Sequence, residues 1–344
     1  MYIGKILIVK TSSLGDIIQA MGVLEELRLR FPRAQIDWVV EERFKPIVEA
    51  HPLVRRAIPF SLKSFRFDYV TSLRKERYDL LFDLQGNTKS GLATLLARSR
   101  KKIGFGRRSV REWPNILATQ IRFEVPLTLN IRDQHSQLLN HFFQDALARE
   151  NRGVCFAIDK EAERLIERLL SAQTSPRIMV CPGSKWMNKQ LPLATWIEFL
   201  SQIKQTLNAS FLLMWGSSEE KAFCEEIRKH IDTSLVVDQL PVPVWQNLMN
   251  KMDLVIAVDS AALHLAGTTQ TPTFSLFGPT SLSVFKPTGP RHFALQGSCP
   301  YNVRFEKTCP KLRTCPSGAC IRELASDPIF QEFIHWWKSL KGLK

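Results

Sequence analysis

The chain has 344 residues, of which 44% are hydrophobic, and a formal net charge of +14 at pH 7. This length exceeds what a single hydrophobic core usually supports, so two domains are expected. The positive charge favours phosphate-rich partners, which include nucleic acid, an anionic membrane and a phosphorylated substrate. The sequence has no apolar run long enough to span a bilayer, and its start is charged too early for a signal peptide, so we expect a cytoplasmic protein.

The first half predicts repeated strand and helix units. Short apolar runs rich in β-branched residues alternate with segments whose apolar residues recur at helical spacing. The predicted strands are 5–9, 35–41, 54–59 and 78–84, and the predicted helices are 16–31 and 44–50. From residue 85 to about 149 the pattern gives way to a basic stretch punctuated by glycines, which is typical of a solvated face.

After a predicted linker at about 150–176, the same alternation restarts. The predicted strands are 177–181, 210–215, 235–238, 254–258 and 273–277, and the predicted helices are 194–207, 219–231, 244–252 and 261–268. This order predicts an α/β fold with two doubly wound parallel sheets facing each other across a cleft. Residues 328–344 predict an aromatic amphipathic helix, which could pack on the protein or touch lipid headgroups.

The loop from Lys10 to Asp16 places a carboxylate between a buried strand and the start of a helix. In open α/β sheets, ligands bind at the carboxyl ends of the strands, where this loop is expected to lie. Asp16 therefore has two interpretations, a catalytic base or an acid that only stabilises its helix, with Ser12 or Ser13 as the cap. Taken alone, the loop favours the second interpretation.

Polar residues also follow three predicted strands of the second half. They are Ser184 and Lys185, then Glu219, then Asp259, Ser260 and His264. The last turn leads directly into a helix, whose free N–H groups favour a diphosphate, and Lys189 could stabilise charge on a leaving diphosphate. Each residue has a structural alternative when taken singly. The absence of Gly-x-Gly-x-x-Gly and Walker motifs argues against a dinucleotide oxidoreductase or an NTPase.

The seven cysteines fall into two groups. Cys155, Cys181 and Cys224 are isolated among apolar or helical residues, which is typical of buried, reduced thiols. Four more lie close together near the carboxyl end: Cys299, Cys309, Cys315 and Cys320. Their intervals lack the CxxC pairs of common zinc ribbons, so free thiols are favoured over a structural metal at these four residues.

Taken together, several segments resemble glycosyltransferase family 9, the lipopolysaccharide heptosyltransferases. The main segments are 8–16, 37–42, 83–86 and 258–264, with further matches at 85–90, 111–114 and 134–135. The amino-terminal segments most resemble the heptosyltransferase I type. Ala261 stands where the family usually has glycine, and the cysteine-bearing segment 309–320 looks more like the tails of heptosyltransferase II.

The resemblance implies a GT-B fold of two Rossmann-like domains and an inverting, metal-independent transfer of L-glycero-D-manno-heptose from ADP-heptose to a Kdo sugar on the lipid A inner core. It implies no cofactor besides this donor. Residues 1–160 would bind the acceptor, residues 161–325 the nucleotide sugar, and residues 326–344 would form a terminal helix able to pack back on the first domain. We expect peripheral association with the cytoplasmic face of the inner membrane and no nucleic-acid partner.

The resemblance also implies roles for individual residues. Asp16 would be the catalytic base, with Lys189 at the diphosphate. The donor would be bound by Ser184, Lys185, Lys189, Glu219, Asp259, Ser260, Ala261 and His264, and the acceptor by Ser13, Gly15, Lys63, Arg66, Lys89 and Arg111. These roles match the chemistry of the transfer, which needs a base at the acceptor hydroxyl and a group that stabilises the charge on the leaving diphosphate.

Two alternatives stay open. The first is the same chemistry in a heptosyltransferase II type or with another nucleotide sugar. The second, from a different class, is a non-catalytic protein that binds nucleic acid or an anionic membrane through its positive charge.

Overall fold

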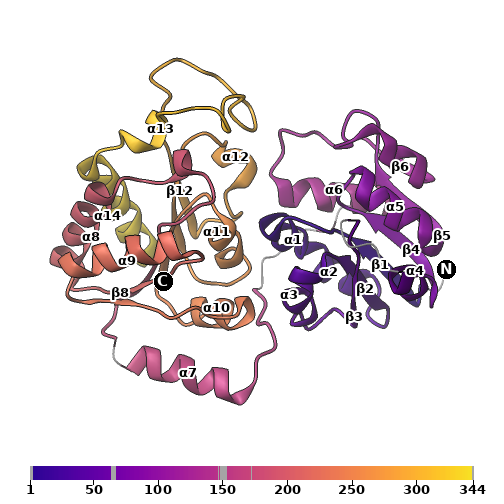
Figure 1. Cartoon of the computed structure of the whole chain (residues 1–344), viewed down its shortest axis with the longest axis horizontal. Helices are drawn as coiled ribbons and strands as arrows, with labels where there is room; N and C mark the ends of the chain where they lie inside the picture. The colour runs from indigo at the N-terminus through magenta and orange to yellow at the C-terminus, as the bar shows by residue number, and fades with distance from the viewer. Residues whose placement is uncertain (1–2, 63–66, 146, 148–152, 172, 343–344) are drawn as a thin grey trace. The chain divides into compact units, whose positions relative to one another are not determined.

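The computed structural model describes residues 3–62, 67–145, 147, 153–171 and 173–342. The chain divides into two compact units, Met1–Glu150 with Val154–Ala157, and Asn151–Gly153 with Ile158–Lys344. Each unit contains one six-stranded sheet whose described strand pairs are parallel (Figure 1). The strand orders, β3-β2-β1-β4-β5-β6 and β12-β11-β10-β7-β8-β9, both follow the Rossmann arrangement. This confirms the α/β fold with two doubly wound sheets.

In the first unit, apolar strands form the centre of the sheet. The strands are β1 (Lys5–Val9), β2 (Gln35–Val40), β3 (Arg56–Pro59), β4 (Arg77–Asp83), β5 (Arg98–Phe105) and β6 (Ile121–Phe123). The α-helices are α1 (Leu14–Ala20), α2 (Gly22–Arg30), α3 (Lys45–Glu49), α4 (Phe67–Arg74), α5 (Thr88–Leu96) and α6 (Ile131–Phe143). Two 3₁₀ helices, η1 (Glu42–Phe44) and η2 (Trp113–Ala118), complete the described elements.

Two predictions for this unit are wrong in detail. The predicted helix 16–31 is two helices that meet at Met21, directly before Gly22, a poor helix former. The basic stretch after residue 85 is not simply a solvated face, because α5, β5, η2, β6 and α6 lie within it. In β5 the basic residues stand at the start and the buried residues at the end, which hides the strand from its apolar pattern.

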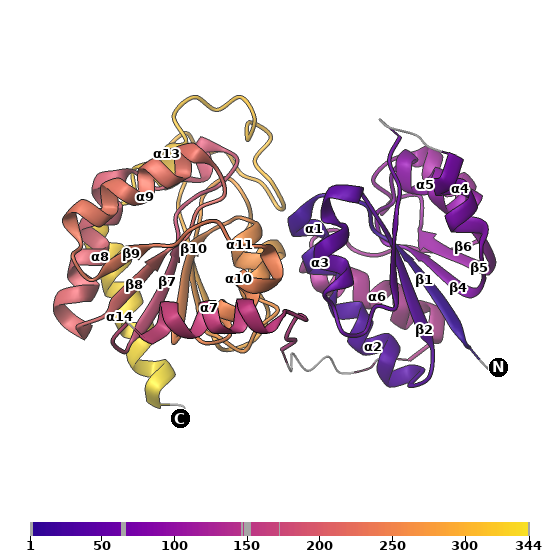
Figure 2. The same cartoon turned by 60° about the horizontal axis from the view of Figure 1, so that its bottom comes forward.

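The second unit follows its predicted order closely. Its strands are β7 (Arg177–Cys181), β8 (Ser210–Leu213), β9 (Ser234–Val236), β10 (Leu254–Val258), β11 (Thr273–Phe277) and β12 (His292–Gln296). Its helices are α7 (Lys160–Ser171), η3 (Met187–Lys189), α8 (Leu193–Leu207), α9 (Ser218–His230), α10 (Val242–Met249), α11 (Ala261–Ala266), α12 (Leu282–Phe285), α13 (Ala319–Arg322) and α14 (Ser326–Gly342). Helix α7 occupies the predicted linker, and β12 was not predicted. Helices cover both faces of this sheet (Figure 2).

The terminal helix α14 packs into the second unit. Phe333 lies edge-on to Phe199 of α8, with ring centroids 5.7 Å apart, and to Phe274 of β11 at 5.3 Å. Trp336 and Trp337 belong to the same buried cluster. The helix therefore packs on the protein, within the second unit. Its aromatic face serves the core of the second unit, because these side chains fill the surface of β11 and α8.

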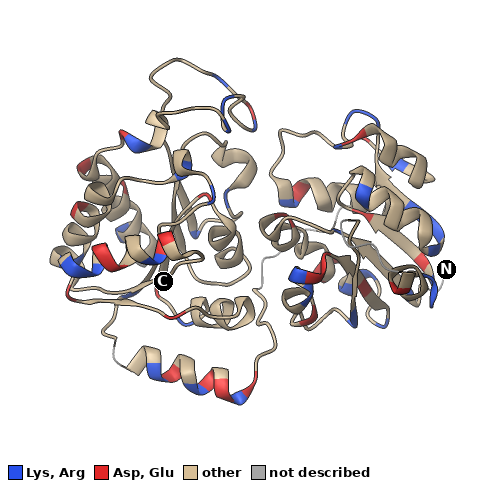
Figure 3. Cartoon of the chain, in the orientation of Figure 1, with Lys and Arg blue, Asp and Glu red and all other residues tan. Residues whose placement is uncertain are grey.

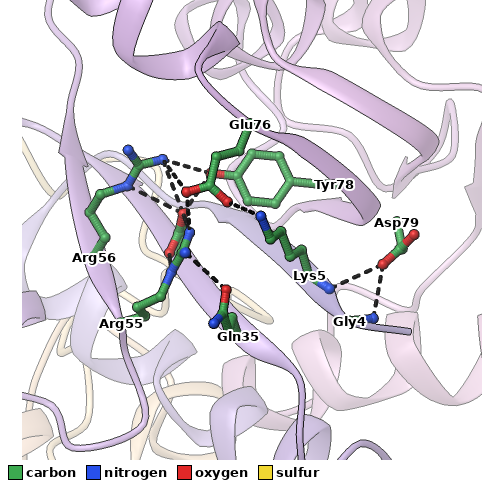
Figure 4. A network of polar contacts seen from close by, with 9 residues as sticks. Gly4, Lys5, Gln35, Arg55, Arg56, Glu76, Tyr78 and Asp79 are labelled. Atoms are coloured by element: carbon green, nitrogen blue, oxygen red, sulfur yellow. Dashed lines mark hydrogen bonds and ion pairs between the residues drawn. The ribbon is translucent and has the colours of Figure 1, made fainter. Parts of the chain in front are cut away.

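Charged residues join the amino ends of four strands in the first unit (Figure 4). The fully buried carboxylate of Asp37 accepts hydrogen bonds from Arg55 at 2.6 Å, from Arg56 at 3.1 Å and from the Tyr78 hydroxyl at 2.6 Å. Glu76 pairs with Arg55 at 2.8 Å. Asp37 belongs to one of the family-like segments, yet it lies at the amino ends of the strands, where it stabilises the sheet.

The structure also bears on membrane insertion. Within the described ranges, every helix falls short of the length and apolar character that a bilayer crossing requires.

Candidate active site

Asp16 lies at the carboxyl end of β1, in the first turn of α1. Its Oδ2 accepts a hydrogen bond from the Ser13 amide at 2.9 Å and another from the Ser13 hydroxyl at 2.8 Å. Ser13 is the N-cap of α1, and Gly15 is the second residue of that helix. The helix-stabilising role of Asp16 is therefore present in the structure. It does not exclude catalysis, because the residue is also partly exposed at the sheet edge where ligands bind.

The charges around Asp16 favour its ionised form. Burial raises the pKa of its carboxyl group, but the Lys10 charge, the two hydrogen bonds from Ser13 and the Arg111 charge together hold it below the ordinary aspartate value. Asp16 is therefore a carboxylate at neutral pH. A carboxylate with a low pKa accepts a proton efficiently only when the attacking oxygen has already become acidic, late in a reaction.

The end of β4 supports the Asp16 loop. Lys10 is buried, and its Nζ donates to the Leu84 carbonyl at 2.9 Å. The Gln85 side-chain oxygen accepts hydrogen bonds from the amides of Thr11 at 3.2 Å and Ser12 at 3.3 Å. Gln85 thus holds the loop from the neighbouring strand. The sequence showed Gln85 only as part of a family-like segment, because the pairing of β1 with β4 is not a local property.

A buried aspartate organises the turn after β4. Asp83 accepts hydrogen bonds from the amides of Gln85 and Gly86, both at 3.0 Å, and from the Asn115 side chain at 2.6 Å. Burial raises the pKa of Asp83 despite these bonds. Gly86 has a φ of +69°, which favours glycine, and its carbonyl accepts a bond from the Glu112 amide at 2.9 Å. This contact brings the adjacent Arg111 towards the Asp16 loop.

The residues expected to bind the acceptor lie partly around this loop. Lys89, in the first turn of α5, donates to the Ser12 hydroxyl at 3.4 Å and pairs with Glu41 at the end of β2. Arg111 acts on Asp16 through its charge. The structure therefore groups Ser13, Gly15, Lys89 and Arg111 with Asp16. Lys63 and Arg66 lie outside the described residues.

In the second unit, Asp259 is the centre of a polar cluster at the carboxyl end of β10. Its Oδ2 accepts hydrogen bonds from Lys189 Nζ at 2.6 Å and from the Thr280 hydroxyl at 2.5 Å. His264 Nε2 lies 3.7 Å from its Oδ1. Burial raises the pKa of Asp259, but Lys189, His264 and Thr280 outweigh burial and lower it. The cluster therefore contains a buried carboxylate that is paired with a lysine and hydrogen-bonded by one hydroxyl group.

Two hydroxyl groups border the Asp259 cluster. Ser184, after β7, is buried and donates to the Asp259 carbonyl at 3.4 Å. Ser260 is the N-cap of α11, and its hydroxyl oxygen is buried without a hydrogen-bond partner among the described residues. Buried polar atoms normally have a partner, so this hydroxyl is available to a ligand. Ala261 is the first residue of α11.

The remaining predicted donor residues are more exposed. Lys185 Nζ lies over the Trp186 ring, 5.9 Å from its centroid. Glu219 begins α9 with Ser218, and its hydrogen bonds with Ser217 and the backbone lower its pKa. Among the described residues, neither side chain forms a hydrogen bond or ion pair with the Asp259 cluster.

The sequence missed two residues of this region. Glu220 accepts a hydrogen bond from the Gly216 amide at 2.7 Å, and a Cβ atom at Gly183 would collide with its carboxylate. Glu220 therefore joins the ends of β7 and β8. Thr280 follows the predicted strand 273–277, so the polar residues after that strand were the signal that could have found it.

The cysteines differ from their expected burial in one case. Cys181 and Cys224 are buried, as predicted, but Cys155 is exposed. Cys299, Cys309, Cys315 and Cys320 are free thiols of intermediate exposure. Among the residues that the structure describes, no group of three or more His, Cys, Asp or Glu side chains is placed to hold a metal ion.

Known proteins resemble this chain in sequence and in fold. The model of "Glycosyltransferase family 9 (heptosyltransferase)" matches residues 66–314. Lipopolysaccharide heptosyltransferase 1 of Pseudomonas aeruginosa is 30% identical over 322 residues, which cover 89% of this chain and 87% of that protein. The structure of E. coli heptosyltransferase WaaC with ADP is 20% identical, with a TM-score of 0.76, over 96% of this chain and 99% of the other. E. coli ADP-heptose lps heptosyltransferase II is 19% identical, with a TM-score of 0.74, over 98% and 99%. These structures confirm the GT-B fold.

Proposed function

Because this chain belongs to glycosyltransferase family 9, the heptosyltransferases, we propose that it transfers L-glycero-D-manno-heptose from ADP-heptose to a Kdo sugar on the inner core of lipid A. The chemistry rests on Asp16, an ionised carboxylate at the carboxyl edge of the first sheet beside Lys10 and Arg111. The heptosyltransferase 1 relative supports this acceptor position.

On the acceptor side, Asp16 takes the proton of the attacking hydroxyl. Its lowered pKa suits a late transfer, when the oxygen has already begun to bond to the anomeric carbon. Lys89 and Arg111 supply positive charge for the anionic acceptor, and Ser13 positions the Asp16 carboxylate. Attack from the face opposite the leaving group inverts the configuration at the anomeric carbon.

On the donor side, the second unit holds ADP-heptose. Lys189 stabilises charge on the leaving diphosphate, and the Ser260 hydroxyl donates to a diphosphate oxygen. Ser184, Lys185, Glu219, Asp259, Ala261 and His264 complete the proposed donor site. A lysine here supplies the charge that a metal ion supplies in other enzymes, so we propose that the transfer needs no metal and no cofactor besides the donor.

We also propose where the reaction occurs. The lipid A acceptor is anchored in a bilayer, so the protein would act in the cytoplasm, associated peripherally with the inner membrane. The net charge of +14 suits that anionic surface, and we expect no nucleic-acid partner.

The test is a substrate panel with the purified full-length chain. We expect ADP release and a heptosylated product with Kdo-bearing lipid A and ADP-heptose, with the opposite anomeric configuration by NMR and no loss of rate in a chelator. The second candidate is the heptosyltransferase II position, because the chain resembles the structure of that enzyme and has a cysteine-bearing tail. A preference for an acceptor that already carries one heptose would assign this position. A preference for a UDP-sugar would refute the donor. DNA binding that weakens steeply with salt, without any transfer, would refute the enzyme.

A further inference from the structure

Large apolar side chains are exposed on three neighbouring helices of the first unit. Ten such side chains are exposed among the described residues, and five of them lie on α4, α5 and η2. We call these five the apolar patch: Phe67, Leu92, Leu95, Trp113 and Leu117. Trp113 is 68% exposed and Leu117 is 70% exposed. Such a concentration on one part of a surface indicates an interaction site.

The helices that carry the apolar patch pack against one another. A Cβ atom at Gly91 of α5 would lie 3.3 Å from the Asn115 Cα of η2, so the two backbones approach closely there. Helix α4 also contacts α5 (Figure 2). Within α5, Leu92 and Leu95 are three residues apart and share a face, while Gly91 and Ala93 are buried.

Positive charge borders the apolar patch. Residues 86–123, which include α5 and η2, contain nine Lys or Arg residues and a single acid, Glu112. Arg107 and Arg108 are exposed in the loop that precedes η2, and Lys102 Nζ donates to the Leu95 carbonyl at 3.1 Å at the other end of α5. Four Lys or Arg residues lie on β5, and Figure 3 shows basic residues in this part of the first unit.

Two acids at this border, Glu112 and Glu124, are hydrogen-bonded within the protein. Glu124 accepts from the Arg108 amide at 3.0 Å and from the Ser109 hydroxyl at 2.9 Å. Glu112 accepts hydrogen bonds from the Thr88 amide at 2.9 Å and the Thr88 hydroxyl at 2.6 Å, and these bonds lower its pKa. They also fasten the start of η2 to the start of α5. The apolar patch is therefore held on a fixed support, with a strongly positive border.

From this combination we propose that the apolar patch docks the protein on a bilayer that contains anionic phospholipid. Exposed Trp and Leu side chains enter the headgroup boundary, and the basic border binds lipid phosphates. Lys89 lies one turn before Leu92 on α5, and Arg111 lies two residues before Trp113, so docking here brings the acceptor-binding edge to the lipid surface. The placing of the acceptor-binding edge at the lipid rests on the proposed function, whereas the binding of the apolar patch to the bilayer does not.

Vesicle flotation with the full-length chain tests the docking. We expect the wild type to bind vesicles of phosphatidylcholine with phosphatidylglycerol, to bind phosphatidylcholine alone at least tenfold more weakly, and to be released by salt. Trp113→Ser and Leu117→Ser should each weaken binding by about tenfold, since each removes one apolar group from the boundary. Arg107→Glu with Arg108→Glu should weaken binding to the anionic vesicles only.

The matched control is Leu29→Ser, because Leu29 is 58% exposed on α2, away from the apolar patch. Loss of binding in Leu29→Ser equal to that in the Trp113 variant would overturn the proposal, as would unchanged binding in both patch variants. A dimer that dissociates in the patch variants, without vesicle binding by the wild type, would also overturn it in favour of a second copy on this surface.

Activity separates this proposal from the proposed function. With a lipid-free Kdo acceptor, Trp113→Ser should keep the wild-type kcat, and with the acceptor embedded in vesicles its rate should fall about tenfold. If no acceptor supports transfer while vesicle binding still depends on the apolar patch, the proposed function fails and the docking stands. If transfer occurs and the patch variants act like wild type on embedded acceptor, the docking fails and the function stands.

Discussion

Asp16 and Asp133 occupy the same position in their helices, the third residue after the N-cap, in α1 and α6 of the first unit. A carboxylate in a first turn favours its helix wherever it lies. Of the two, only Asp16 lies close to the charges of Lys10 and Arg111, on the loop that Gln85 holds. Comparing variants of the two residues therefore separates the loss of helix stabilisation, which both share, from the loss of a catalytic base, which only Asp16 provides.

We expect Asp16→Asn to lower kcat by about 100- to 10,000-fold, the range that loss of a general base produces. Its affinity for ADP-heptose, measured by calorimetry, should match that of the wild type, because the proposed donor residues lie in the second unit. Asp133→Asn is the control and should retain the wild-type kcat. Equal rates in the two variants would refute Asp16 as the base.

The lowered pKa of Asp16 predicts the pH dependence of the reaction. The carboxylate is the active form. An ordinary aspartate has a pKa of about 4, and the pKa of Asp16 is lower, so activity should be lost only at a pH below that ordinary value. Ser13→Ala removes one of the hydrogen bonds that lower this pKa and should move the acid limb of kcat to higher pH. Ser99→Ala is the control: it removes a hydroxyl that bonds the Lys101 carbonyl on β5, and it should leave the acid limb in place.

Gln85 is predicted to position the catalytic loop. Gln85→Leu leaves the Thr11 and Ser12 amides without their acceptor and should cost about 1–3 kcal/mol of unfolding free energy. It should also lower kcat without changing the affinity for ADP. Gln85→Glu keeps the acceptor and should restore most of kcat. Gln120→Leu removes a similar acceptor at the exposed Lys102 amide, and a comparable loss of kcat there would contradict a specific role for Gln85.

Lys189 is predicted to support both the fold and ADP binding. Lys189→Met leaves Asp259 buried without its lysine and should lower the free energy of unfolding by about 3 kcal/mol, measured in urea. Adding Asp259→Leu should recover part of that stability but no ADP binding. Lys204→Met breaks the exposed pair with Asp232 and should cost less than about 1 kcal/mol. An equal loss of unfolding free energy in Lys189→Met and Lys204→Met would show that the buried pair contributes no more than the exposed one.

His51 predicts a stability change with pH. Burial lowers its pKa to about 4, against about 6.5 for an unfolded chain. Between these values the unfolded chain binds the proton and the folded protein does not, so His51 should destabilise the fold increasingly as pH falls from 7 to 4, by about 3 kcal/mol. His51→Asn keeps an acceptor for the Leu53 amide and should remove this part of the pH dependence. The measurement is the free energy of unfolding in urea between pH 4 and pH 7. If it changed with pH equally in the wild type and the variant, His51 would not cause the change.

The sequence predicted those parts of the fold that depend on local pattern. Strands β10 and β11 lie where their apolar runs predicted them, because strands buried on both faces are apolar throughout. The charged start of β5 and the polar ends of β12, His292 and Gln296, lack that pattern, and neither strand was predicted. Asp16, Ser184 and Asp259 were found because polar residues between the end of a strand and the start of the next helix mark the binding edge of a parallel sheet.

The sequence by itself therefore determined the α/β class, the order of most elements and the residues at the strand ends. Only the tertiary structure showed that Gln85 holds the Asp16 loop, that Thr280 bonds Asp259, that Asp37 joins the amino ends of strands, and that α14 completes the second core. Each of these contacts joins segments distant in the chain. Periodicity specifies which face of an element is buried, but the order of strands in the sheet decides which side chains meet.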